Sequence, residues 1–315
     1  MKKRVAVAGA GLAGIASVWF LLKNGFEVVL FDPKGIGGGA SGVSTGLLHP
    51  FPGKKASRSW RSAEGMEATR ELLAVAEKAL GRSVADLSGI FRPAITQQQR
   101  VDFQALIDPD AVWKQISLPG MSETSGLWIQ KGITVFSRLY LQGLWKACER
   151  EGATFMQEKF SADASFDAAV WATGFEMTHL EACKDLSLRS AIGQSLLCKW
   201  KDPLPFSLAS QGYITVTENP NFCQVGSTYE HTKEPDPKKA LELIEKVSLF
   251  YPPAKDFSIV EIRSGTRISP KDGHQPIVKQ VDKKTWVFTG LGSRGMLYHA
   301  LISKELVLDM LRSVD

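Results

Sequence analysis

The sequence predicts an α/β protein in which a nucleotide-binding domain with a parallel sheet is interleaved with an α+β domain built on an antiparallel sheet. Three observations predict this class. A short apolar run near the N-terminus leads into the glycine-rich turn VAGAGLAG at residues 7–14. Two later apolar runs also lead into glycines, FDAAVWATGF at residues 166–175 and TWVFTG at residues 285–290. The segments between them are β-rich and broken by turns, which indicates a second domain.

The first elements form a βαβ unit. Residues 4–8 are apolar and β-prone, residues 15–23 are compatible with a helix that ends near Asn24-Gly25, and residues 26–32 read as a second buried strand. The basic start followed by an apolar run is also a feature of signal peptides. The glycine spacing predicts a strand, a turn and a helix instead.

The glycine turn has the spacing of a dinucleotide-binding fingerprint. Gly9, Gly11 and Gly14 form GxGxxG between a predicted strand and a predicted helix, which is the context that the fingerprint requires. Asp32 stands at the end of the next strand, where a carboxylate can accept hydrogen bonds from a ribose. Together these features favour a Rossmann-like domain over an ordinary glycine-rich turn, with Leu12 and Ala13 completing the pyrophosphate turn.

The rest of the chain alternates between the two predicted domains. A loop rich in Gly, Ser and Pro covers residues 35–53, and helices are expected at residues 62–80, 138–151 and 237–250. Strand-like runs such as YITVT and FCQVGS follow residue 186, and a glycine turn and a long helix follow the TWVFTG strand. We therefore assign the nucleotide-binding domain to residues 1–85, 155–185 and 262–315, and the second domain to residues 86–154 and 186–261.

Composition narrows the class of function. The net charge of +5 and pI of about 8.9 are compatible with an anionic substrate or cofactor, but they are far from the clustered charge of a dedicated nucleic-acid binder. The four cysteines are scattered and form no CxxC pair, so we expect neither a zinc site nor a disulfide framework, and no other metal site is indicated. No apolar segment is long enough to span a bilayer. A cytoplasmic, reducing location is the expectation.

Further motifs give the chain a family resemblance. The loop GGGASGVSTGLLHP at residues 37–50 follows Asp32, and VWATGF, RSGTRISPKDGHQPIV and GLGSRGM follow in that order. In this arrangement the sequence resembles the D-amino-acid oxidase and glycine oxidase superfamily of FAD-dependent oxidoreductases. Within that superfamily it is most similar to the FAD oxidase domain of bifunctional enzymes that modify the wobble uridine of tRNA. The likeness covers nearly the whole chain.

The resemblance implies FAD as the cofactor and a substrate domain that caps it. The first glycine turn would bind the pyrophosphate, while the turn at residues 290–295 would lie against the isoalloxazine. There the N-terminus of the last helix would stabilise the negative charge that develops on reduction. Besides the first turn and Asp32, the implied cofactor-binding residues are Ala40, Ser41, Thr45, Gly46, Ala172, Thr173, Gly174, Gly292, Ser293, Arg294, Gly295 and Met296.

The resemblance also suggests residues for the substrate. Gly265-Thr266-Arg267 matches a segment in which arginine binds a substrate carboxylate, so Arg267 is the first candidate, with Arg263 as the alternative if the register differs. Arg294 is a second basic candidate beside the flavin or the substrate. His49 is a third candidate, although a loop histidine without an evident partner is more often structural.

Three functions remain open at the level of sequence. The first is FAD-dependent oxidation of a C–N bond of an amino acid or secondary amine, by hydride transfer to flavin N5. The second applies the same chemistry to a carboxymethylaminomethyl-type uridine carried by tRNA. The third is a flavin-binding protein whose cap no longer supports catalysis. The expected partner is thus a small-molecule amine or amino acid, or a tRNA, with no membrane; the oligomeric state stays open.

Overall fold

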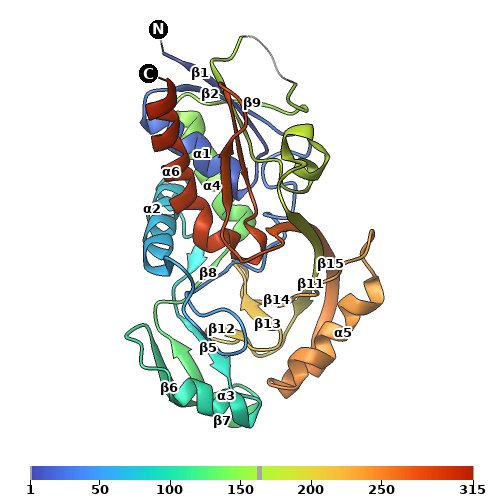
Figure 1. Cartoon of the computed structure of the whole chain (residues 1–315). Helices are drawn as coiled ribbons and strands as arrows, with labels where there is room; N and C mark the ends of the chain where they lie inside the picture. Colours follow the sequence, from blue (N-terminus) through green and yellow to red (C-terminus); the bar gives the residue numbers. More distant parts are fainter. Residues whose placement is uncertain (1, 162–164, 315) are drawn as a thin grey trace.

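The first of the two large sheets has six strands, which come from both ends and the middle of the chain. The computed structural model describes residues 2–161 and 165–314 (Figure 1). The strand order is β16-β17-β10-β1-β2-β9, and every neighbouring pair is parallel except β16 with β17. The carboxyl ends of β1, β10 and β17 therefore lie at one edge of the sheet. The strands are β1 (Arg4–Ala8), β2 (Glu27–Phe31), β9 (Thr154–Met156), β10 (Ala168–Trp171), β16 (Ile277–Gln280) and β17 (Thr285–Thr289).

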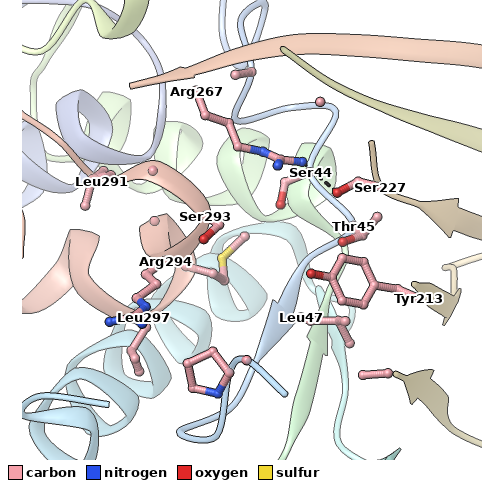
Figure 2. A pocket seen from close by; sticks show the side chains of 18 of the residues that line it. Ser44, Thr45, Leu47, Tyr213, Ser227, Arg267, Leu291, Ser293, Arg294 and Leu297 are labelled. Atoms are coloured by element: carbon pink, nitrogen blue, oxygen red, sulfur yellow. Dashed lines mark hydrogen bonds between the residues drawn. The ribbon is translucent and has the colours of Figure 1, made fainter. Parts of the chain in front are cut away.

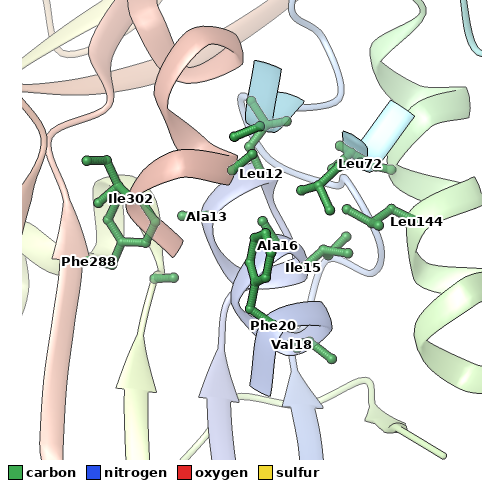
Figure 3. Close-up of a cluster of buried hydrophobic side chains, with 14 of the residues drawn as sticks. Leu12, Ala13, Ile15, Ala16, Val18, Phe20, Leu72, Leu144, Phe288 and Ile302 are labelled. Carbon is green, nitrogen blue, oxygen red and sulfur yellow. The ribbon is translucent and has the colours of Figure 1, made fainter. Parts of the chain in front are cut away.

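Four helices pack together beside this sheet. They are α1 (Leu12–Lys23), α2 (Ser62–Leu80), α4 (Ser137–Arg150) and α6 (Gly295–Val314). Helix α1 is apolar on most of its surface because it contacts β1, β2, α4 and α6. Figure 3 shows side chains of this core, among them Ile15, Leu72, Leu144 and Ile302, converging from the four helices. None of the helices in the described part of the chain has the length and apolarity needed to cross a membrane.

The second large sheet has eight strands. Its order is β15-β11-β14-β13-β12-β5-β7-β6, and its neighbours are antiparallel except β12 with β5. Helix α5 (Pro237–Ser248) covers β11 and β14, and α3 (Gln97–Gln104) contacts β7. The strands are β5 (Ile90–Pro93), β6 (Ala111–Leu118), β7 (Met121–Ile129), β11 (Leu188–Lys199), β12 (Ser207–Ala209), β13 (Tyr213–Val216), β14 (Phe222–Gly226) and β15 (Ser258–Pro270).

Short elements join the two sheets. A three-stranded sheet consists of β3 (Leu47–Leu48), β8 (Ile133–Val135) and β4 (Ala85–Asp86) in the order β3-β8-β4. The 3₁₀ helices are η1 (Gly174–His179), η2 (Glu181–Cys183), η3 (Pro252–Asp256) and η4 (Gly292–Arg294). Helix η4 leads directly into α6. Thus the long loop after β2 and the last glycine turn both reach the region between the sheets.

The observed arrangement differs from the predicted domain boundaries in two places. We assigned residues 86–154 to the second domain, but α4 packs on α1 and α2. The reason is that the apolar face of α4, including Tyr140 and Leu144, is buried in the same core as α1. Conversely, β15 pairs with β11 along its length, so residues 262–270 belong to the eight-stranded sheet.

Candidate active site between the two sheets

A cavity of about 880 Å³ lies between the carboxyl edge of the first sheet and one face of the second. Its walls are the N-terminus of α1, the loop after β2, the turn between β17 and α6, and strands β11, β13 and β15 of the second sheet. The predicted residues on its surface are Gly11, Leu12, Ala13, Ala40, Ser41, Thr45, His49, Ala172, Gly174, Arg267, Gly292, Ser293, Arg294, Gly295 and Met296. Segments far apart in the sequence thus meet around one space.

The first glycine turn has the geometry of an anion cradle. Gly9 has a φ of +106°, and a Cβ there would lie 2.7 Å from the carbonyl carbon of Ala172. A Cβ at Gly14 would overlap the Gly9 carbonyl. Gly11 caps the N-terminus of α1 without a side-chain hydrogen bond, and it faces the cavity. The positive end of the α1 dipole and its free amides therefore face the space where a pyrophosphate would bind.

Two polar side chains brace this turn. Asp32 accepts hydrogen bonds from the amides of Ala10 and Lys34, each at 2.8 Å, and the hydroxyl of Ser41 accepts one from the amide of Leu12 at 3.1 Å. Asp32 does not line the cavity, so its contact with a ribose stays a prediction. Each of its carboxylate oxygens accepts a single hydrogen bond from the described residues and keeps a lone pair for a ligand.

The second glycine turn faces the first across the cavity. Residues 289–297 all line it, and α6 begins there at Gly295. Two hydroxyls at the ends of neighbouring strands, those of Thr173 and Thr289, are buried and have no hydrogen-bond partner in the described part of the chain. A native structure seldom leaves such groups unpaired, so they indicate a missing polar ligand. The two cradles and these hydroxyls fit a long dinucleotide cofactor such as FAD. Of the remaining predicted cofactor residues, Gly46 lies under the loop against Val135 and not on the cavity surface.

Arg267 brings a partly buried cation into the cavity from β15. Figure 2 shows its side chain entering the same space as the phenol of Tyr213, with Ser293 and Arg294 on the opposite side. Its Nη2 donates to the hydroxyl of Ser227 at 2.9 Å, and it forms no ion pair within the described residues. Burial lowers the pKa of Arg267 from its usual range. A partly buried guanidinium without a carboxylate partner is a favourable site for an anion.

The glycine at position 193 makes room for this arginine. A Cβ at Gly193 on β11 would lie 2.5 Å from Cζ of Arg267, so the guanidinium lies directly over the glycine. Gly193 and Arg267 are both on the cavity surface. This contact has no local sequence signal, because it depends on the pairing of β11 with β15.

The other sequence candidates divide into two groups. Arg294 and His49 line the cavity, whereas Arg263 is outside it and forms a 2.8 Å ion pair with Glu261. The Nδ1 of His49 accepts a hydrogen bond from the amide of Phe51 at 3.2 Å. Burial, and then the positive charge of Arg92, lower the pKa of His49 to about 3. His49 is therefore a neutral imidazole with its proton on Nε2.

Sequence reasoning missed two cavity residues, Arg92 on β5 and Tyr213 on β13. Arg92 is 4% exposed, and burial lowers its pKa to about 10. Arg92, Tyr213 and Arg267 all line the same cavity. Neither Arg92 nor Tyr213 belongs to a local motif, and only the strand pairing brings them to the cavity.

Comparison with known proteins agrees with a cavity that holds FAD. The family model described as "FAD dependent oxidoreductase" matches residues 4–307. The crystal structure of glycine oxidase from Geobacillus kaustophilus is similar, with a TM-score of 0.82 at 20% identity, covering 99% of this chain and 95% of that one. At this identity the likeness concerns the fold.

Curated relatives from two species carry the name tRNA 5-methylaminomethyl-2-thiouridine biosynthesis bifunctional protein MnmC. The one from Leptospira interrogans serovar copenhageni is 23% identical over 98% of this chain. The one from Maricaulis maris is 52% identical over 46 residues, which are 15% of this chain and 8% of that protein. The chain spans 57% of the length of the Leptospira relative.

Proposed function

Because the chain belongs to the FAD dependent oxidoreductase family, we propose that it oxidises the C–N bond of an amino acid or secondary amine that carries a carboxylate. FAD is the cofactor of this family. When bound, FAD supplies the acceptor for the hydride that leaves the carbon next to nitrogen.

One observation carries the proposal: the guanidinium of Arg267, which forms no ion pair with any described residue, lies in the cavity that the second glycine turn also lines. A carboxylate on Arg267 would form charge-assisted, bidentate hydrogen bonds and neutralise a charge that the fold partly buries. Such an anchor holds the neighbouring carbon in one orientation toward the opposite wall. Gly193 leaves space for the anchor over β11, because a Cβ there would lie 2.5 Å from Cζ of Arg267.

The remaining cavity groups suit a neutral amine and a dry site. His49 stays uncharged at neutral pH, so it adds no second positive charge beside the amine, and its Nε2–H remains available as a donor. The N-terminus of α6 lines the cavity at Gly295 and directs the positive end of its dipole there. The positive end of the α6 dipole would stabilise negative charge on a cofactor bound in the cavity beside it.

The test is an anaerobic titration of the purified flavoprotein, followed by its visible absorption. The panel contains glycine, sarcosine, proline and other D- and L-amino acids. We expect at least one of them to bleach the flavin band, and Arg267→Met to slow bleaching by roughly a hundredfold at unchanged FAD content. Arg263→Met is the matched control, since Arg263 is paired with Glu261 outside the cavity. A flavin band that no amine bleaches would favour the non-catalytic hypothesis.

A second candidate function is FAD-dependent processing of a carboxymethylaminomethyl-type wobble uridine in tRNA. The names of the Leptospira and Maricaulis relatives support it. It uses the same carboxylate anchor but requires a polynucleotide partner. The distinguishing measurement is tRNA affinity at 50 and 200 mM salt. Binding that weakens steeply with salt would favour this candidate, and negligible binding at both concentrations would exclude it.

A further inference from the structure

The cavity contains a second arginine, which is buried and which the proposed reaction does not use. Arg92 projects from β5 in the second sheet, at the end of the cavity lined by α3 and the loop at residues 49–55. Its guanidinium donates to the carbonyl oxygens of Phe51 and Gly53, and it lies over the ring of Phe103 at 5.2 Å. Both carbonyls belong to that loop, so the arginine is held in a fixed position.

The charge of Arg92 is not neutralised. Its two recorded acceptors are uncharged carbonyls, its Nε is buried without a partner, and no described carboxylate lies within ion-pair distance. Arg58 shows the contrast. It also lies over a ring, that of Phe51, but it is paired with Asp108 and Asp110 and is outside the cavity. Burial of a cation without an anionic partner costs free energy, and the binding of an anion would offset this cost.

Strand pairing places Arg92 and Arg267 on the same face of the second sheet. Phe91 on β5 is paired with Leu208 on β12, so the next residues along, Arg92 and Ala209, are neighbours by extension of this register. Ala209 is paired with Tyr213 on β13. At a spacing of about 4.8 Å between strands, Arg92 and Tyr213 are roughly 10 Å apart at the backbone. Gly193, under the guanidinium of Arg267, lies two strands beyond β13. The two arginines thus stand at opposite ends of one groove, with Tyr213 between them.

The charge of the groove is also one-sided. Among the described residues that line the cavity, the only acidic one is Asp102, while the basic ones are Lys54, Lys55, Arg92, Lys246, Arg267 and Arg294. The first glycine turn is expected to bind the cofactor's pyrophosphate, and the second is expected to lie against its isoalloxazine. They leave Arg92, on the other sheet, for a different anion.

We propose that the substrate carries two acid groups, one at each end of a chain that contains the amine. Arg267 binds the carboxylate next to the oxidised carbon, and Arg92 binds the distal carboxylate. This inference rests on the proposed function for the role of Arg267, and it narrows the substrate class to amines with two carboxylates. Because the arginines are separated by Tyr213, a spacer of several atoms must separate the acid groups.

The test measures binding without turnover. Isothermal titration of the FAD-loaded protein uses straight-chain dicarboxylates of increasing length, each matched with the monocarboxylate of the same number of carbons. We expect one length at which the dicarboxylate binds at least tenfold more tightly than its partner. Arg92→Met should bring that ratio close to one, and Arg92→Lys should retain part of it. Arg58→Met, which disturbs the same loop, should leave the ratio unchanged.

Two results would overturn the inference. One is a ratio near one at every length in the unmodified protein, which decides the matter even if Arg92→Met does not fold. The other is a large ratio that persists in Arg92→Met, since the distal acid would then be bound elsewhere, for example by Lys54 or Lys55. The proposed function is tested separately by flavin bleaching. If an amine bleaches the flavin but the affinity ratio is one at every length, only the proposal of a second carboxylate on the substrate is overturned.

Discussion

Gly193→Ala is the substitution that tests the carboxylate anchor most directly, because it changes the position of Arg267 without removing it. A Cβ at residue 193 would lie 2.5 Å from Cζ of Arg267, whereas ordinary contacts begin near 3.4 Å. The guanidinium must therefore move by about 0.9 Å, the difference between 3.4 and 2.5 Å. A displacement of about 1 Å in a group that positions substrate costs on the order of a hundredfold in rate.

The assay is anaerobic stopped-flow reduction of the flavin by the best amine of the panel, with the limiting rate and the substrate Kd recorded separately. We expect Gly193→Ala to reduce the ratio of rate to Kd by about a hundredfold while FAD content is unchanged. Stability should change little, because alanine in a strand is favoured over glycine by about 0.5–1 kcal/mol and this gain offsets local crowding.

A double-mutant cycle separates this effect from a general disturbance of β11. When Arg267 is already methionine, the added alanine at position 193 meets no guanidinium, so its effect on reduction should fall to less than threefold. Equal losses in both backgrounds would refute the link between the two residues. Unchanged kinetics of Gly193→Ala itself would refute the assignment of Arg267 as the anchor.

Three other substitutions have defined outcomes. Gly9→Ala should abolish FAD binding, because φ is +106° and the new Cβ would lie 2.7 Å from the Ala172 carbonyl carbon; a variant that purifies with its flavin would contradict the cradle. His49 is held below its unfolded pKa, so its stabilisation is complete above pH 6.5 and is lost as the pH falls towards 3. Urea unfolding of His49→Gln should show a pH slope smaller by up to about 1.4 kcal/mol per unit near pH 5, and an unchanged slope would place the proton uptake elsewhere. Tyr140→Phe removes the donor 2.7 Å from Nε2 of the fully buried His299; it should lower the free energy of unfolding by about 1–3 kcal/mol, and no loss would mean that water replaces the hydroxyl.

The sequence alone was sufficient to predict those elements whose structure depends on neighbouring residues in the chain. The turn at Gly9, Gly11 and Gly14 depends on residues within one strand, turn and helix, and the structure has that arrangement. The helices predicted at residues 62–80 and 138–151 are present as Ser62–Leu80 and Ser137–Arg150. In each case the spacing of apolar residues determines the element.

What the sequence left undetermined depends on pairing between distant segments. The amphipathic pattern of α4 shows that one face is buried, but not that α1 and α2 cover it. Likewise, Arg92 and Tyr213 become neighbours only through β12, and Gly193 meets Arg267 only through the pairing of β11 with β15. The family resemblance indicated Arg267 but had no equivalent signal for Arg92.

The strand order of the first sheet also has a consequence for biosynthesis. Strand β10 lies between β1, formed from the first residues of the chain, and β17, formed from residues 285–289. A ribosome that has released only the first 280 residues would expose one edge of β10 and leave the cavity without the wall formed by residues 288–297. Parallel pairing across such sequence distances is slow and leaves that edge open to aggregation. The last glycine turn therefore becomes available to the flavin only when this final segment has been made, and flavin that binds the folded chain stabilises it.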